Sequence, residues 1–185
     1  VFAGLIISLA ISVNFISKKK TSKIYIEPLS NFTNRYGKFA LSIILLIGLY
    51  RIADIVMGVV ANIFYLEKGF DIKEIATYSK FFGVFATILG GFLGGFFSFK
   101  FGIMKSLFLG ALVAAGSNLL FAWLAISTAS IKLLIIVITA DNISSGFAGA
   151  AFVVYLSNLT SIKFTATQYA LLSSIMLFIP KLIAG

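Results

Sequence analysis

The stretch "LIGLYRIADIVMGV" (residues 46–59) places an arginine and an aspartate three residues apart inside a long apolar run. The run covers about residues 39–66 and exceeds the roughly 20 residues that a helix needs to cross a bilayer. Of the 185 residues of the chain, 60% are hydrophobic and 11% are charged, and the mean hydropathy is +1.08. This composition is typical of a membrane protein, and we predict an all-α transmembrane fold.

Apolar runs of similar length recur along the chain and predict about six spanning helices in total. A polar link at residues 18–38, with Pro28, Gly37 and no helical apolar stripe, separates the first run from the others. Lysines follow the first run instead of preceding it, so we interpret it as the end of a spanning helix and not as a signal peptide. Both ends of the chain fall within apolar sequence, from which we expect a piece of a longer protein. The predicted spans are about residues 1–17, 39–66, 81–99, 106–126, 133–159 and 164–185.

Basic residues gather in alternate loops, which predicts the orientation of the chain in the membrane. The richer set of loops is expected on the cytoplasmic side, because cytoplasmic loops carry an excess of lysine and arginine. The poorer set also carries Glu67, Asp71 and Glu74. The predicted cytoplasmic residues are Lys18, Lys19, Lys20, Lys23, Arg35, Lys38, Lys100, Lys105 and Lys163, and those on the other side are Lys68, Lys73, Lys80 and Lys132.

The chain contains no cysteine and no histidine. Their absence excludes disulfides, thiol nucleophiles, Cys/His metal sites and Ser-His-Asp arrangements within this segment. No carboxylates stand in pairs at catalytic spacing, so we predict that the chain is not an enzyme and holds no metal or other cofactor. The formal charge of +9 would suggest nucleic acid in a soluble protein, but here basic residues separate apolar runs. Membrane orientation explains them better than a nucleic-acid partner does.

A helical projection of residues 39–66 separates an aliphatic face from a polar face. Spacings of three and four give one continuous aliphatic stripe, which we expect to face lipid. The charged residues lie on the opposite face and therefore face protein or water. The stripe consists of Leu45, Leu49, Ile52, Val56, Val59, Ile63 and Leu66, and the opposite face carries Arg51, Asp54, Gly58, Ala61, Asn62 and Tyr65.

A charge near the centre of a bilayer costs about 2.5 to 17 kcal/mol, depending on the water and the partners that it finds. Asp54 lies roughly 24 Å along the helix from Lys38, too far for it to reach the nearer interface. Arg51 can pair with it across one helical turn, and the pair is either a structural brace or a coupling device. In the second interpretation Asp54 takes up and releases a proton, and Arg51 stabilises its charged form until an anionic substrate competes. We favour the second, because ionisable residues in spans commonly mark a pathway.

Glycines recur at helical spacing in the run at residues 81–99. Gly90 and Gly94 form one GxxxG pair, and Gly91 and Gly95 form a second. Such pairs let two helix backbones approach closely, and close packing drives helix association in lipid. We therefore expect these four glycines to pack helices and to have no further role.

Four polar residues in the last two runs are candidates for substrate contact. Asp141 and Asn142 lie near the middle of their run, where they either satisfy an interhelical hydrogen bond or line a cavity. Gln168 and Tyr169 lie near the cytoplasmic start of the last run, where helix capping and interface anchoring would explain them almost as well.

Six stretches between Tyr50 and Gly185 together resemble the AmpG-type muropeptide permeases of the major facilitator superfamily. The last of them, with its spacing to the aspartate-asparagine helix, is the most specific. The stretches are "YRIADIVMG" (50–58), "LEKGFDIKEIATYSKFFG" (66–83), "GGFLGGFFSFKFG" (90–102), "GSNLLFAWLA" (116–125), "DNISSGFAGAAFVVYLSNL" (141–159) and "FTATQYALLSS" (164–174).

The resemblance implies a major facilitator helical bundle, of which this chain would hold about six of twelve spans. Residues 1–17 would then be the end of helix 6, residues 18–38 the central cytoplasmic link, and residues 39–185 the C-terminal half with helices 7–11. Residues 95–105 resemble the superfamily's G-x3-D-R-x-G-R-R loop, although Phe99 stands where the acidic residue is expected. The matching loop residues are Gly95, Lys100, Gly102 and Lys105.

The resemblance also implies a function. The family imports N-acetylglucosaminyl-1,6-anhydro-N-acetylmuramyl peptides from the periplasm across the bacterial inner membrane, driven by the proton gradient. The expected partners are this sugar-peptide, the lipid bilayer and the N-terminal half of the same transporter. Family members often carry lysine and glutamate at the positions of Arg51 and Asp141. The residues carried over are Arg51 and Asp54 for proton coupling and Arg51, Asn62, Asp141, Asn142, Gln168 and Tyr169 for substrate binding.

Two alternatives to this function stay open. The acetyl-coenzyme A carriers are the nearest rival family, but their substrate carries several phosphates and the spans hold one buried basic candidate, Arg51. The second alternative is a non-transporting membrane protein, such as a scaffold, a sensor or the remnant of a split gene.

Overall fold

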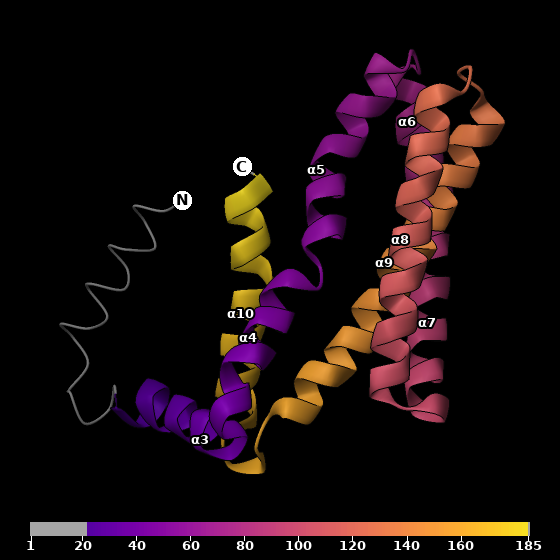
Figure 1. The fold of residues 1–185 in the computed structure, drawn as a ribbon. Helices are drawn as coiled ribbons and strands as arrows, with labels where there is room; N and C mark the ends of the chain where they lie inside the picture. Colours follow the sequence, from indigo (N-terminus) through magenta and orange to yellow (C-terminus); the bar gives the residue numbers. More distant parts are fainter. Residues whose placement is uncertain (1–21, 185) are drawn as a thin grey trace.

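The computed structural model of the chain describes residues 22–184, and every regular element in that range is helical (Figure 1). The predicted span end at residues 1–17 lies outside the described residues. Two of the short elements, η1 and η3, are π-helices, and η2 and η4 are 3-10 helices. In chain order the elements are η1 (Ser22–Ile26), α3 (Glu27–Tyr36), η2 (Gly37–Phe39), α4 (Ala40–Leu49), α5 (Ile52–Glu67), α6 (Ile72–Tyr78), η3 (Ser79–Gly83), α7 (Val84–Phe101), α8 (Ile103–Ile126), α9 (Ile131–Leu159), η4 (Ile162–Phe164) and α10 (Thr165–Ala184).

Within residues 22–184, five helical stretches are long and apolar enough to cross a membrane, which agrees with the five spans predicted after residue 38. The chain is therefore an all-α, multi-pass membrane protein. In Figure 1, α7 and α8 lie side by side, and α9 runs obliquely from this pair to the lower end of α10. The five stretches are Ile24–Glu67, Ile72–Phe101, Ile103–Ile126, Ile131–Leu159 and Ile162–Leu182.

The polar link departs from the prediction, because residues 22–36 are helical. Pro28 stands in the first turn of α3, where its missing N–H leaves no intrahelical bond unmade. Phe32 lies one turn further on the same face and is buried against the rest of the bundle, so α3 does have an apolar face. The helix ends at Gly37, whose φ of +50° favours glycine. The expectation of a link without a helical stripe is therefore wrong for this part of the chain.

The span predicted at residues 39–66 is interrupted in its middle. Helix α4 ends at Leu49 and α5 begins at Ile52, and Arg51 between them has φ −102° and ψ 12°, outside the helical region. Figure 1 shows the bend between α4 and α5 as a short non-helical segment. The expectation of one continuous helix is wrong at this point.

The buried apolar side chains form two separate clusters, one on each side of this interruption. The lower core, at the lower end of the molecule in Figure 1, joins α3, α4 and α10 to the C-terminal part of α9 and includes Phe152 and Leu156. The upper core joins α5 and α6 to the end of α8 and the start of α9 and includes Tyr65 and Leu134. On α9 the two cores are separated by residues 139–150, which include Thr139, Asp141, Asn142, Ser144 and Ser145.

Two of the four predicted packing glycines lie at the close contact between α7 and α9. A Cβ added at Gly90 would lie 2.9 Å from the carbonyl carbon of Ile143, and one at Gly94 would lie 2.9 Å from Cα of Phe147. At Gly91 an added Cβ would make only an ordinary contact, at 3.9 Å. Gly95 departs from the expectation, because nothing in the described chain lies within 4 Å of its added Cβ.

Candidate functional site

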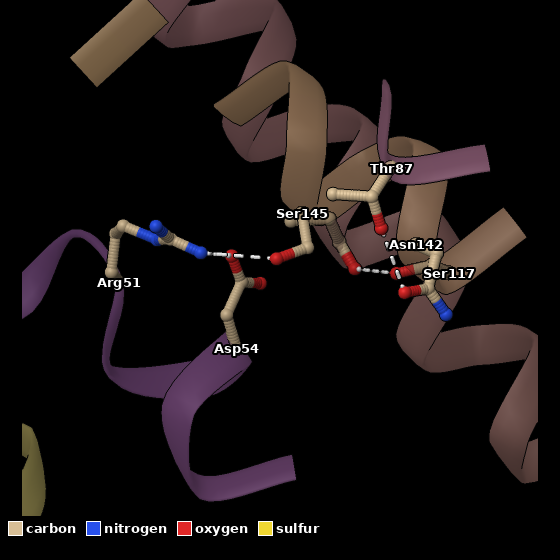
Figure 2. A network of polar contacts seen from close by, with 7 residues as sticks. Arg51, Asp54, Thr87, Ser117, Asn142 and Ser145 are labelled. Atoms are coloured by element: carbon tan, nitrogen blue, oxygen red, sulfur yellow. Dashed lines mark hydrogen bonds and ion pairs between the residues drawn. The ribbon is translucent and has the colours of Figure 1, made fainter. Parts of the chain in front are cut away.

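Arg51 and Asp54 form an ion pair beside α9. The Arg51 Nη2 group lies 3.3 Å from Asp54 Oδ2 and donates a second hydrogen bond to Ser145 Oγ at 3.0 Å. The two side chains are 22% and 12% exposed, so the pair is mostly buried (Figure 2). The sequence predicted the pair, and the structure adds Ser145 as its third member.

The interruption of the span is what allows Arg51 to reach α9. Because Arg51 precedes the first turn of α5, its side chain crosses to α9 while Asp54 stays within that turn, where the helix dipole favours a carboxylate. Gly149 provides the space, since a Cβ added there would lie 3.2 Å from Arg51 Nη1. The Nε atom of Arg51 is buried and has no hydrogen-bond partner in the described chain. The Nε–H donor of the guanidinium is therefore unpaired within the described chain.

Asp141 and Asn142, the pair predicted on α9, connect α9 to α8 and α7 through further polar contacts. The Asp141 carboxylate forms a hydrogen bond with the side chain of Ser117. Asn142 accepts a hydrogen bond from Thr87 Oγ1 at 2.9 Å and donates one to the carbonyl of Ile138 at 2.8 Å. Figure 2 shows the labelled side chains in a row, from Arg51 and Asp54 past Ser145 to Asn142, Thr87 and Ser117. We call them the polar belt: Arg51, Asp54, Thr87, Ser117, Asp141, Asn142 and Ser145.

Gln168, Tyr169 and Asn62 lie outside the polar belt. Gln168 is 2% exposed, and its amide is occupied within the protein: it donates to the Pro28 carbonyl at 2.8 Å and to Asn31 Oδ1 at 3.2 Å, and accepts from the Ser161 N–H at 2.7 Å. The bonds to Pro28 and Asn31 connect α10 to α3, and all three favour the structural interpretation of Gln168.

Tyr169 packs against the lower core, next to Gln168 on α10. Asn62 is exposed on α5 and lines a cavity of about 310 Å³ together with Ile75 and Lys80. Arg51 does not line this cavity, so the structure does not bring Asn62 to the ion pair.

The predicted loop motif surrounds the turn between α7 and α8. Lys100 Nζ lies 5.9 Å from the ring of Phe96 and 5.4 Å from that of Phe101, and Gly102 forms the turn with φ +92°. Lys105 lines a cavity of about 680 Å³ that extends to α3 and to the end of α9. Phe99, at the position of the superfamily's acidic residue, is 92% exposed.

The sequence predicted no role in the site for Ser145, Ser117 or Tyr50, which contact the predicted residues. A signal was present for Ser145, because Asp141, Ser145 and Gly149 recur every four residues and so share one face of α9. Among the described residues, no group of three or more metal-binding side chains occurs. The belt can hold charge in apolar surroundings, bind an anion through Arg51 and exchange a proton at a carboxylate.

Comparison with known proteins gives related sequences but no matching family model. The chain is 36% identical over 162 residues to a protein of Rickettsia conorii named "Putative transporter AmpG 4", which covers 88% of this chain and 39% of that protein. It is 38% identical over 149 residues to the protein of the same name from Rickettsia felis, covering 80% and 36%. It is 35% identical over 161 residues to "Putative transporter AmpG 3" of Rickettsia typhi, covering 87% and 38%. The chain thus spans about two fifths of the length of these curated relatives.

Proposed function

This chain is a homologue of the AmpG proteins, and we propose that it is the second-half portion of a proton-coupled carrier of the major facilitator type. The proposed carrier imports anhydro-muropeptides from the periplasm across the bacterial inner membrane. Residues 22–38 would belong to its central cytoplasmic link, and an N-terminal half would complete the substrate path. The observation that carries the proposal is the mostly buried Arg51–Asp54 pair on the polar belt.

The first supporting point is the position of the pair between the two apolar cores. Carriers bind substrate near the middle of the membrane, where interrupted helices present polar groups. The pair stands at an interruption of a predicted span, with the lower core on one side and the upper core on the other. A charged pair at such a place favours a transport pathway over a purely structural role.

The second supporting point is the chemistry of Arg51. A guanidinium binds a carboxylate through two parallel hydrogen bonds, and a muropeptide carries carboxylates on its peptide stem. Nε of Arg51 is without a partner, and Nη2 is shared between Asp54 and Ser145. A substrate carboxylate that takes over Nε and Nη2 would separate Arg51 from Asp54. Asp54, without its counter-ion in an apolar place, would then take up a proton, and the two events would be coupled.

An uptake assay tests the proposal with the whole polypeptide that contains this chain. Proteoliposomes with an imposed proton gradient should accumulate labelled anhydro-muropeptide, and a protonophore should abolish accumulation. In Asp54→Asn we expect accumulation to be lost while exchange of internal for external substrate persists, because exchange needs no net proton movement. Glu67→Gln, at the exposed end of the same helix, is the matched control and should behave as the unaltered protein. Full accumulation in Asp54→Asn would refute the proton role, and no uptake by the unaltered protein would refute the carrier.

A further inference from the structure

Tyr50 stands at the point where the first described span is interrupted, and the proposed function gives it no role. A break in a helix leaves backbone groups without intrahelical partners, so a break inside a membrane needs support from neighbouring helices. The neighbours here are α8 and α9. Tyr50 contacts both of them.

The Tyr50 side chain is held on three sides. Its hydroxyl donates a hydrogen bond to the carbonyl of Leu107 on α8, at 2.7 Å. Its ring stacks on that of Phe152 on α9, with centroids 4.9 Å apart and planes at 8°. The hydroxyl also lies over Gly110, where an added Cβ would come within 2.6 Å of the oxygen. Gly110 is thus the space that Tyr50 needs in order to reach α8.

The side chains of Tyr50 and Arg51 contact neighbouring positions on one face of α9. Arg51 contacts Ser145 and lies against Gly149, while Tyr50 stacks on Phe152. These three positions on α9 follow at spacings of four and three, which is a single helix face. Since the two side chains are adjacent in the chain, fixing Tyr50 between α8 and α9 fixes the point from which Arg51 extends.

We propose that Tyr50 is a positioning residue, which holds the break against α8 and α9 so that the Arg51 guanidinium stays within reach of Ser145 and Asp54. The effect on transport rests on the function proposed above, whereas the effect on the break does not. The hydroxyl of Tyr50 and the empty space at Gly110 are two parts of the same contact. Disturbing either should therefore have the same consequence.

The first test measures the break itself by electron paramagnetic resonance on the chain in lipid nanodiscs. Because the chain contains no cysteine, spin labels can be placed on Leu41→Cys and Ile63→Cys, both exposed and roughly 30 Å apart along the span. We expect Tyr50→Phe and Gly110→Ala each to broaden or shift the distance distribution. Gly116→Ala is the matched control, because it lies on the same helix and has open space around it. An unchanged distribution in both test variants would overturn the proposal.

The second test asks whether Tyr50 acts through Arg51, using substrate KM for uptake by the whole polypeptide. Loss of one neutral hydrogen bond predicts a rise in KM of about fivefold for Tyr50→Phe, with little change in kcat. In an Arg51→Gln background, Tyr50→Phe should add nothing further, because the residue that it positions is gone. An additive rise in the double variant would show a merely structural role and overturn the positioning role. If the unaltered protein does not transport, the proposed function fails and the resonance test alone decides the role of Tyr50 at the break.

Discussion

Replacing Gly94 by alanine is expected to weaken the contact between α7 and α9. The added Cβ would lie 2.9 Å from Cα of Phe147 and 3.0 Å from its carbonyl carbon. These are backbone atoms of a long helix and cannot turn aside as the end of a side chain can, so the two helices must separate. Overpacking of this kind costs about 1–3 kcal/mol, whereas alanine gains about 1 kcal/mol over glycine as a helix former. We expect a net loss of up to about 2 kcal/mol in the free energy of unfolding.

Gly95→Ala is the control that separates packing from helix propensity. It makes the same chemical change one residue further along α7, where nothing lies within 4 Å of the added Cβ. Because the propensity gain is common to both variants, Gly95→Ala should be more stable than Gly94→Ala by about 1–3 kcal/mol. Equilibrium unfolding in mixed micelles with increasing sodium dodecyl sulfate, followed by far-ultraviolet circular dichroism, measures both variants. Equal stability of the two variants would refute the account of this contact.

Three further variants test other features. Gln168→Ala removes two hydrogen bonds between α10 and α3 and a third to Ser161, and should lower the free energy of unfolding by about 1–3 kcal/mol in the same denaturation experiment. Gly102→Ala should cost about 1–3 kcal/mol through backbone strain alone, because its φ is +92° and its surroundings are open; an unchanged midpoint would contradict this. Ser145→Ala removes one of the two acceptors of Arg51 and should raise the substrate KM for uptake about two- to tenfold; an unchanged KM would contradict this.

The spans and the charged face of the first described span could be predicted from sequence, because length, hydropathy and helical spacing are local properties. The break at Tyr50 and Arg51 could not, since neither residue is a strong helix breaker. Tyr50 donates a hydrogen bond to Leu107, 57 residues away, and stacks on Phe152. The sequence shows that Leu107 and Phe152 are present, but it does not show that Tyr50 contacts them.

The glycines illustrate the same limit in packing. The pairs Gly90/Gly94 and Gly91/Gly95 have identical spacing, so the pattern predicts a close helix contact without choosing the face. The facing backbone of Ile143 decides the choice. In the polar belt, likewise, the ion pair of Arg51 follows from spacing within one helix, whereas Ser145 as its third member requires knowing which face of α9 is turned toward it.

The hydrogen bonds of Gln168 also affect the order in which the chain can assemble during synthesis. Gln168 stands 140 residues after Pro28 and 137 residues after Asn31, the two partners to which it donates. At about 5–20 residues per second, a ribosome needs roughly 7 to 30 s to pass from one end of this contact to the other. During that time the intervening spans must enter the membrane while α3 still lacks its bonds to α10. Helix α3, which is synthesised first within the described chain, therefore gains these bonds among the last. If the ribosome stops before Gln168, α3 remains without its bonds to α10.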